Sequence, residues 1–296
     1  MNLDGLIQQW MEFENGKAPA RLLRVGLYLI VAYSILILGW PNHEYLWGEH
    51  ALIAPMTFPD LWTNDIIMFL HKESYRSWYP LFMVLPFVGM AIVFFTRWTR
   101  VGALLVFIGT SVLFNRSYTY LTGGNYLLHL LLFYLVFIDE KENGSSTKAK
   151  CSNILSNFGQ WACRLQVIIV YLFTGAYKMA GETWRSGEAV YIITHVDEFT
   201  LPFIENGIAE IHWLMVVANY MALVYFFTFP FLVWSKRWKL PLLLSGAFFH
   251  LTLGIVIGVF DFSLIMIASY AAFLDDESIQ RISSILPIKK RAMTHH

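Results

Sequence analysis

The chain has 296 residues, of which 57% are hydrophobic, 17% are aromatic and only 14% are charged. This composition excludes an ordinary soluble domain and indicates that lipid is the solvent. The formal net charge is zero and no long basic run occurs, so nothing in the sequence indicates a nucleic-acid partner. The only cysteines are Cys151 and Cys163, which form neither a disulfide framework nor a CxxC redox motif.

The first half of the chain predicts four membrane-spanning helices. Residues 1–20 carry apolar side chains at helical spacing, which predicts an amphipathic helix on the membrane surface or against the protein's own helices. The polar and aromatic residues 41–78 predict an interfacial segment outside the bilayer core. The apolar stretches that predict spans are 25–40, 79–96, 101–114 and 126–138.

The second half predicts four further spans after a polar link at 139–161. We expect these spans at 162–180, 211–234, 240–258 and 262–274, with a basic cytoplasmic tail at 281–296. No sequence repeat relates the two halves. The sequence therefore predicts one all-α membrane domain of about eight helices over residues 1–280.

The distribution of Lys and Arg predicts the orientation of this bundle, because cytoplasmic loops carry the excess of positive charge. With the N-terminus inside, most of these residues fall on the cytoplasmic side. The outer segments hold only Lys72, Arg76, Arg116, Lys178 and Arg185. We therefore expect both termini in the cytoplasm and Lys178 at the outer face.

Lys178 is the first candidate for a functional residue, because it ends an otherwise apolar helix. A charge at membrane depth costs about 2.5 to 3.5 kcal/mol on insertion scales, so a chain rarely keeps one without a use. Lysines near helix ends can also reach the interface and do nothing chemical. Arg164, Tyr171 and Lys178 are spaced by seven, so they share one helix face, which must contact protein or water.

Two residues that follow Lys178 allow two interpretations of its role. The carboxylate of Glu182 would keep the lysine charged in a structural ion pair. An apolar lid formed by Trp184 would instead favour the neutral amine, which can act as a base. The sequence leaves both interpretations open.

Other polar residues lie inside predicted helices. Asn125 and His129 form an i, i+4 pair, which suits either hydrogen bonds between helices or substrate binding. His250 lies midway along the seventh span, where an ionisable residue faces a cavity or a partner. Asp261, at the outer turn, is an acidic group that could meet Arg116 or Lys178.

Common catalytic and nucleotide-binding motifs are missing from the sequence. It contains no GxSxG, P-loop or dinucleotide fingerprint, so hydrolase, ATPase and Rossmann functions have no support. Histidines at 43, 50 and 195 accompany acidic residues, but no HExxH or similar ligand spacing occurs, and we expect no metal site.

Residues 166–191 read QVIIVYLFTGAYKMAGETWRSGEAVY. This stretch resembles the signature of the vitamin K-dependent gamma-carboxylase and its bacterial relatives, the horizontally transferred transmembrane (HTTM) domain proteins. In that family a helix that begins with glutamine and ends in lysine is followed by an acidic link, a tryptophan and a glycine. The matching residues are Gln166, Lys178, Glu182, Trp184 and Gly187.

Two further segments resemble parts of the same family. Residues 123–139 are similar to its fourth span, and residues 248–270, which contain His250, are similar to its late FH and FS-x-x-M segments. The resemblance implies an all-helical core that, in the carboxylase, oxygenates a reduced quinone and uses the resulting base to take a proton from glutamate. The family's lysine base matches Lys178. At the position of the carboxylase's fourth-span histidine, our register places Gly124.

Two classes of function therefore stay open. The first is an enzyme of the bacterial cytoplasmic (inner) membrane, with gamma-carboxylase-like or epoxidase-like chemistry on a quinone, a lipid or an exported peptide. A reduced quinone would be its cofactor, and Lys178 and His250 would be catalytic. The expected substrate-binding residues are Asn125, Arg116, Tyr171, Trp184, Glu182 and His129.

The second class is a non-catalytic membrane factor in peptide toxin maturation or immunity. It follows from the same resemblance, because a bacterial HTTM protein resembles a factor needed to make a secreted sporulation-delaying toxin. A transporter would require inverted repeats and helices broken at the midplane, which the sequence does not show.

Overall fold

The computed structural model describes residues 17–48, 51, 78–117, 121–141, 146–196, 200 and 202–279. Every regular element in these ranges is a helix, which confirms the predicted all-α class. The tail predicted at 281–296 lies outside the described residues, as do most of the outer segment predicted at 41–78 and most of the surface helix predicted at 1–20.

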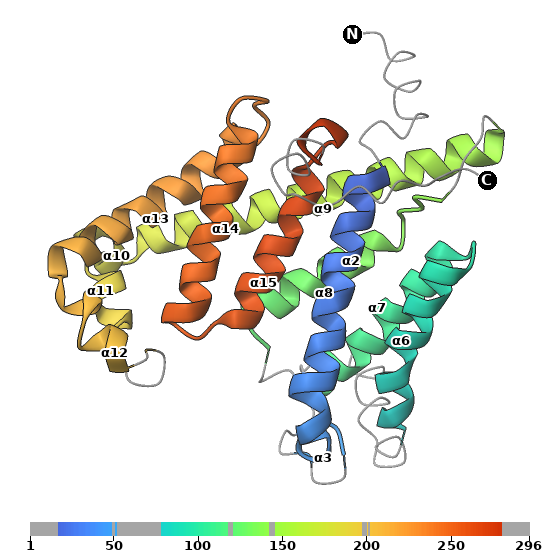
Figure 1. Ribbon diagram of the computed structural model, residues 1–296, viewed down its shortest axis with the longest axis horizontal. Helices are drawn as coiled ribbons and strands as arrows, with labels where there is room; N and C mark the ends of the chain where they lie inside the picture. The colour runs from blue at the N-terminus through green and yellow to red at the C-terminus, as the bar shows by residue number, and fades with distance from the viewer. Residues whose placement is uncertain are drawn as a thin grey trace, which may run out of the picture.

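Figure 1 shows the helices in chain order. The longer ones are α2 (Lys17–Tyr33), α6 (Tyr79–Phe95), α7 (Thr99–Arg116), α8 (Gly123–Leu135), α9 (Thr147–Ala180), α13 (His212–Leu232), α14 (Lys239–Val256) and α15 (Phe260–Ser269). The shorter ones are η1 (Ser34–Gly39), η2 (Trp40–Asn42), α3 (His43–Leu46), α10 (Glu182–Ser186), α11 (Ala189–Ile193), α12 (Pro202–Glu205), η4 (Ile208–Glu210) and η5 (Tyr270–Phe273).

Three helical stretches of the described chain are long and apolar enough to cross a membrane. They are Lys17–Leu46, His212–Leu232 and Lys239–Val256. Two more, Tyr79–Phe95 and Phe260–Phe273, are apolar but shorter. A full span needs about 20 residues. The chain is thus an all-α protein with three candidate membrane-spanning helices.

Most helices lie close to the predicted apolar stretches. The first helical stretch is longer than the span predicted at 25–40, since it runs from Lys17 to Leu46, and the largest difference is in α9. This helix begins at Thr147 rather than at Ala162, because the hydroxyl of Ser146 accepts a hydrogen bond from the amide of Ala149 at 3.2 Å and caps its first turn. Most of the polar link expected at 139–161 is therefore helical. At 1.5 Å per residue, α9 is roughly 50 Å long, which exceeds the thickness of the hydrocarbon core.

The helices surround a shared core (Figure 1). α2, α8 and α15 contact one another, and α14 packs beside α15. The pair of α6 and α7 lies on one side of the molecule. α9 runs across the bundle: Gly159 contacts the chain after α8, and Gly175 contacts Phe226 and Phe227 of α13. This long helix therefore connects the two ends of the structure.

α6 and α7 approach so closely that only glycine fits at the crossing. A Cβ atom placed on Gly89 would lie 2.5 Å from the carbonyl oxygen of Gly102, and the reverse holds for a Cβ on Gly102. Farther along, Gly109 faces Pro86 in the same way. Small residues at helix crossings allow backbones to touch, which is how helices associate in lipid without a hydrophobic driving force.

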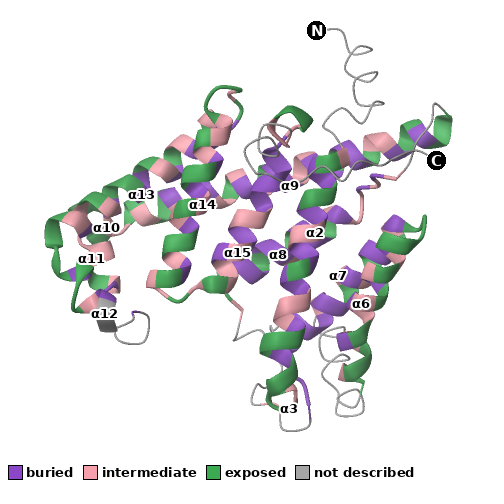
Figure 2. Cartoon of the chain, viewed as in Figure 1, coloured by how far each residue is buried: buried purple, intermediate pink, exposed green. Residues whose placement is uncertain are grey.

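The outer helices carry many exposed residues (Figure 2), and a large share of these are bulky and apolar. α14 buries only four residues, which recur every three or four positions: Leu243, Gly246, His250 and Gly254. Phe248 on the same helix is 74% exposed. A helix that is apolar on both its buried and its exposed faces suits a lipid environment, since water would penalise the exposed face.

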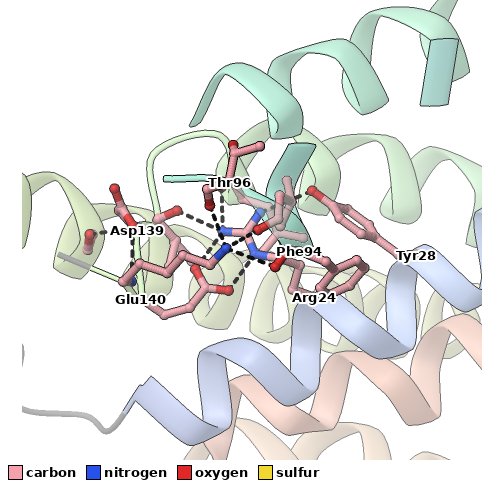
Figure 3. A network of polar contacts seen from close by, with 11 residues as sticks. Arg24, Tyr28, Phe94, Thr96, Asp139 and Glu140 are labelled. Carbon is pink, nitrogen blue, oxygen red and sulfur yellow. Dashed lines mark hydrogen bonds and ion pairs between the residues drawn. The ribbon is translucent and has the colours of Figure 1, made fainter. Parts of the chain in front are cut away.

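A buried ion pair joins α2 to the chain that follows α8 (Figure 3). The Arg24 guanidinium donates to the carboxylate of Glu140 at 2.7 and 3.0 Å, to the hydroxyl of Tyr28 at 3.1 Å, and to the carbonyl oxygens of Leu135 at 3.3 Å and Ile138 at 2.7 Å. Arg24 is fully buried. Because the carboxylate and the carbonyl oxygens satisfy its donors, the charge is tolerated inside the protein.

Two more cationic side chains, those of Lys141 and Arg100, form hydrogen bonds around the chain that follows α8. The amino group of Lys141 donates to the carbonyl oxygen of Thr96 at 2.7 Å, just beyond α6. Arg100 of α7 donates to the carbonyl oxygens of Phe137 at 3.2 Å and Ser152 at 3.0 Å. Residues 137–141 cover the end of the span predicted at 126–138 and the start of the polar link predicted at 139–161, and they are bound to α2, α6 and α7.

Candidate functional site

Lys178 lies against two aromatic rings at the end of α9. Its amino nitrogen is 3.6 Å from the centroid of the Trp184 ring and 5.9 Å from that of Phe226. The side chain is half-buried. A lysine over the face of an indole ring is attracted to the negative face of the π system, a contact worth about 0.5 to 2 kcal/mol. Trp184 therefore covers Lys178 as a lid.

Trp184 is held in place by contacts with α13. The side-chain amide of Asn219, which is completely buried, donates to the carbonyl oxygen of Trp184 at 2.9 Å. The hydroxyl of Tyr220 donates to the carbonyl oxygen of Arg185 at 2.8 Å. Gly187 then turns the chain with φ of 89°, a left-handed conformation that favours glycine. The short helix α10 is thus fixed on α13 with its tryptophan over the lysine.

The two interpretations of Lys178 can be compared in this geometry. Glu182 is exposed. Among the described residues, the salt bridges within 4.0 Å do not include a pair between Lys178 and Glu182. The arrangement therefore corresponds to the lysine with an aromatic lid rather than to the structural ion pair.

Tyr171, two helical turns before Lys178, belongs to a buried chain of polar groups. Its hydroxyl lies 2.8 Å from Nε2 of His250 and also contacts the hydroxyl of Tyr270. The Tyr270 hydroxyl lies 3.3 Å from that of Tyr225, which donates to the carbonyl oxygen of Leu242 at 3.1 Å. Four helical elements, α9, α13, α14 and η5, therefore meet at this tyrosine–histidine chain.

Aromatic packing and one glycine make room for the tyrosine–histidine chain. The ring of Phe229 lies 4.2 Å from that of Tyr171 and stacks on Tyr270 at 5.6 Å, measured between centroids. A Cβ atom on Gly246 would collide with the hydroxyls of Tyr225 and Tyr270. Glycine at this position of α14 is what allows the hydroxyl groups to meet beside the helix backbone.

The predicted polar face of α9 is thus present, but its members have different partners. At one end, Arg164 donates to the carbonyl oxygen of Ala272 in η5 at 2.7 Å. In the middle, Tyr171 binds His250. At the other end, Lys178 meets Trp184. The ring centroid of Phe226 lies 5.9 Å from the amino nitrogen of Lys178 and 6.0 Å from the ring centroid of Tyr171. Phe226 therefore lies between Lys178 and the tyrosine–histidine chain.

Three other predicted residues lie elsewhere in the bundle. The side-chain oxygen of Asn125 accepts hydrogen bonds from the amide and hydroxyl of Thr122 at 2.8 and 2.9 Å, which caps α8. His129 lies 3.2 Å from the hydroxyl of Ser111 and packs on Phe107. Arg116 is buried at the end of α7. The contacts of Asn125 and His129 are with α7 and the start of α8, and they do not involve Lys178.

Sequence reasoning missed several members of these groups. Tyr225, Tyr270 and Asn219 are three polar residues among many in apolar helices, and no motif distinguishes them. Arg24 directly precedes the span predicted at 25–40, and Glu140 lies in the polar link predicted at 139–161, so nothing in the sequence paired them. Their burial against each other depends on a contact between residues 116 positions apart, which no local pattern indicates.

In the described residues, no three His, Cys, Asp or Glu side chains gather where they could hold a metal ion. The helical fold of the described residues and its three candidate membrane-spanning helices indicate the class of α-helical membrane proteins. Comparison with known proteins narrows this class no further, since no family model, curated protein or solved structure matches the chain.

Proposed function

We propose that the protein is an integral membrane enzyme in which Lys178 acts as a base. The observation that carries the proposal is the position of its amino group, which lies 3.6 Å from the centroid of the Trp184 ring and forms no ion pair within 4.0 Å among the described residues. An amine that no carboxylate of the described residues holds is available to a substrate. It can take a proton from an acidic group or bind an anionic one as the ammonium ion.

The proposed orientation places this amine at the outer face of a bundle of about eight spans. In Figure 1 the beginnings of α2, α7 and α14 lie on one side of the molecule, and their other ends lie on the opposite side. The first side carries the cationic residues Arg21, Arg97 and Lys236, whereas Arg185 lies near the end of α9. This asymmetry supports a cytoplasmic location for the first side.

The substrate class that we propose is a membrane-dissolved quinone or lipid, or an exported peptide. The exposed apolar faces of α13 and α14 suit a protein surrounded by lipid, from which such a molecule could reach the end of α9. A reduced quinone as cofactor, gamma-carboxylase-like or epoxidase-like chemistry, and the bacterial inner membrane follow from the HTTM resemblance of residues 166–191.

A comparison of three purified proteins tests the role of Lys178. Wild type, Lys178→Met and Lys236→Met are extracted from the same membranes, and the molecules that accompany them are identified by mass spectrometry. Lys236 is exposed near the start of α14 and provides a matched control. We expect a quinone, lipid or peptide that accompanies wild type and Lys236→Met but is depleted at least tenfold from Lys178→Met.

Equal recovery of the same molecules with all three proteins would contradict the proposal. The non-catalytic factor in toxin maturation or immunity would then be the better description. Intrinsic tryptophan fluorescence and circular dichroism of the three proteins show whether Lys178→Met retains the fold, so a loss of ligand can be separated from a loss of structure.

A further inference from the structure

The hydrogen bonds of the tyrosine–histidine chain run in one direction, which the contact between Tyr225 and Leu242 determines. The carbonyl oxygen of Leu242 can only accept a hydrogen bond, so the hydroxyl of Tyr225 must donate to it. A phenol has one proton to donate. Taking the 3.3 Å contact between the hydroxyls of Tyr225 and Tyr270 as a hydrogen bond, Tyr270 is its donor.

The same reasoning continues to the imidazole. Since Tyr270 donates to Tyr225, it must accept from Tyr171. Tyr171 has then used its own proton, so its oxygen accepts the hydrogen bond from Nε2 of His250 at 2.8 Å. The neutral imidazole therefore carries its proton on Nε2, and Nδ1 has a free lone pair.

Nδ1 of His250 is buried and has no hydrogen-bond partner among the described residues. The histidine as a whole is 1% exposed. A buried polar nitrogen without a partner is unfavourable, and nearly all such groups in proteins are satisfied. The rings around the imidazole include Phe249, at 5.1 Å between centroids, and Phe262, at 5.5 Å, and both lie edge-on to it.

We propose that Nδ1 of His250 is the acceptor in a second binding site, for an apolar molecule that presents an uncharged hydroxyl or N–H donor. The lone pair on Nδ1 can only accept a hydrogen bond, so the ligand must present a hydrogen-bond donor. A carbonyl or ether oxygen, which only accepts, is therefore excluded. The ring contacts of His250 are with Tyr171, Phe249, Phe262 and Tyr270, none of which offers a carboxylate to accompany a cationic ligand. The recognised group is therefore neutral.

This site is separate from the one proposed for Lys178. Two helical turns of α9, about 10 Å, separate Tyr171 from Lys178. The imidazole can accept a hydrogen bond whether or not Lys178 is a base. The tautomer of His250 is consequently a readout that does not depend on any catalytic activity of the protein.

Nitrogen NMR of histidine-labelled protein in lipid nanodiscs measures this tautomer directly. The resonances of His250 are assigned with His250→Gln. We expect a neutral imidazole with a proton on Nε2 and none on Nδ1. A proton on Nδ1 in wild type would overturn the proposal.

A substitution at Tyr225, the end of the tyrosine–histidine chain farthest from His250, tests the direction of the hydrogen bonds. Tyr225→Phe removes the donor to Leu242, so Tyr270 can donate to Tyr171, and Tyr171 can then donate to Nε2. We expect the Nε2–H tautomer to lose its dominance in this variant. Tyr177→Phe, on the exposed side of α9, is the matched control and should leave the tautomer unchanged. An unchanged tautomer in folded Tyr225→Phe would contradict the assigned direction.

The ligand class is tested with phenol and its methyl ether, anisole. Both are flat and apolar, but only phenol has a hydroxyl donor. We expect phenol to shift the Nδ1 resonance in a saturable manner and anisole to leave it within the error of the measurement. Equal shifts with the two compounds, or no shift with phenol, would show that Nδ1 does not select a donor and would overturn the proposed site.

Discussion

Glu140 accepts two hydrogen bonds from the guanidinium of Arg24, and both side chains are almost completely buried. The pair joins α2 to the chain between α8 and α9. It therefore fixes the start of the predicted polar link, at Glu140, against α2. The pair also gives a direct test of the fold.

Glu140→Leu should lower the free energy of unfolding by about 3 to 5 kcal/mol, because it leaves the Arg24 charge buried without a counter-ion. Thermal unfolding in detergent, followed by circular dichroism, measures the loss. Glu182→Leu changes an exposed carboxylate by the same substitution and should have little effect. Similar melting temperatures for the two variants would show that the buried ion pair is not needed.

Gly246→Ala should destabilise the protein by about 1 to 3 kcal/mol, because overpacking of a filled core forces neighbouring groups to move. The added methyl group would displace the hydroxyls of Tyr225 and Tyr270. Gly123→Ala is the control, since a Cβ atom there meets nothing within 4 Å. Unfolding midpoints measured in the same detergent compare the two. A smaller loss for Gly246→Ala than for Gly123→Ala would contradict the packing described for α14.

Asp275 gives the stability a predictable dependence on pH. Partial burial alone would raise the pKa of its carboxyl group, but hydrogen bonds from Lys239 at 2.6 Å and from the amide of Ser278 at 2.8 Å outweigh this effect and hold the pKa well below its usual range. Because the folded-state pKa is depressed, the stabilisation is complete above the unfolded-state pKa of about 4 and is lost as the pH falls below it.

The comparison of wild type with Asp275→Asn tests this pH dependence. We expect wild type to unfold at the higher temperature at pH 7 and the difference to shrink as the pH falls from about 5 to 2. Asp276→Asn, at an exposed neighbouring position, should follow wild type throughout. A difference between wild type and Asp275→Asn that grows as the pH falls would have the wrong sign for a depressed pKa.

Cysteine labelling tests the predicted orientation with a residue that the protein already contains. Cys151 is exposed near the start of α9, whereas Cys163 is buried. We expect a membrane-impermeant maleimide to label Cys151 only from the cytoplasmic side, and to label Glu182→Cys in a Cys151→Ser background only from the outside. Labelling of both positions from one side would show that α9 does not cross the membrane.

Much of the fold is accessible from the sequence, because each helix in lipid must satisfy its own backbone hydrogen bonds. The predicted apolar stretches at 79–96, 211–234 and 240–258 correspond to α6, α13 and α14. The start of α9 was placed too late. There the helix is polar and its boundary depends on the cap at Ser146, a local interaction that hydropathy does not register.

The candidate site was only partly accessible in the same way. The spacing of Arg164, Tyr171 and Lys178 placed them on one helix face. Lys178 and Trp184 are close in the sequence, so their proximity in space was also expected. The partners of Tyr171 come from α13, α14 and η5, at positions that no repeat or motif relates. Their meeting depends on how the helices cross, which residue spacing within one helix does not specify.

The sequence by itself indicated that the helices are surrounded by lipid, that the fold is all-α, and that an ionisable residue lies at the end of α9. Composition and 3.6-residue periodicity are sufficient for these properties because they act within single segments. Only the tertiary structure decided that Lys178 lies under an indole ring, that Arg24 is neutralised by Glu140, and that His250 ends a directed chain of hydroxyls. Each of these depends on contacts between distant segments, where a side chain's partner is set by packing.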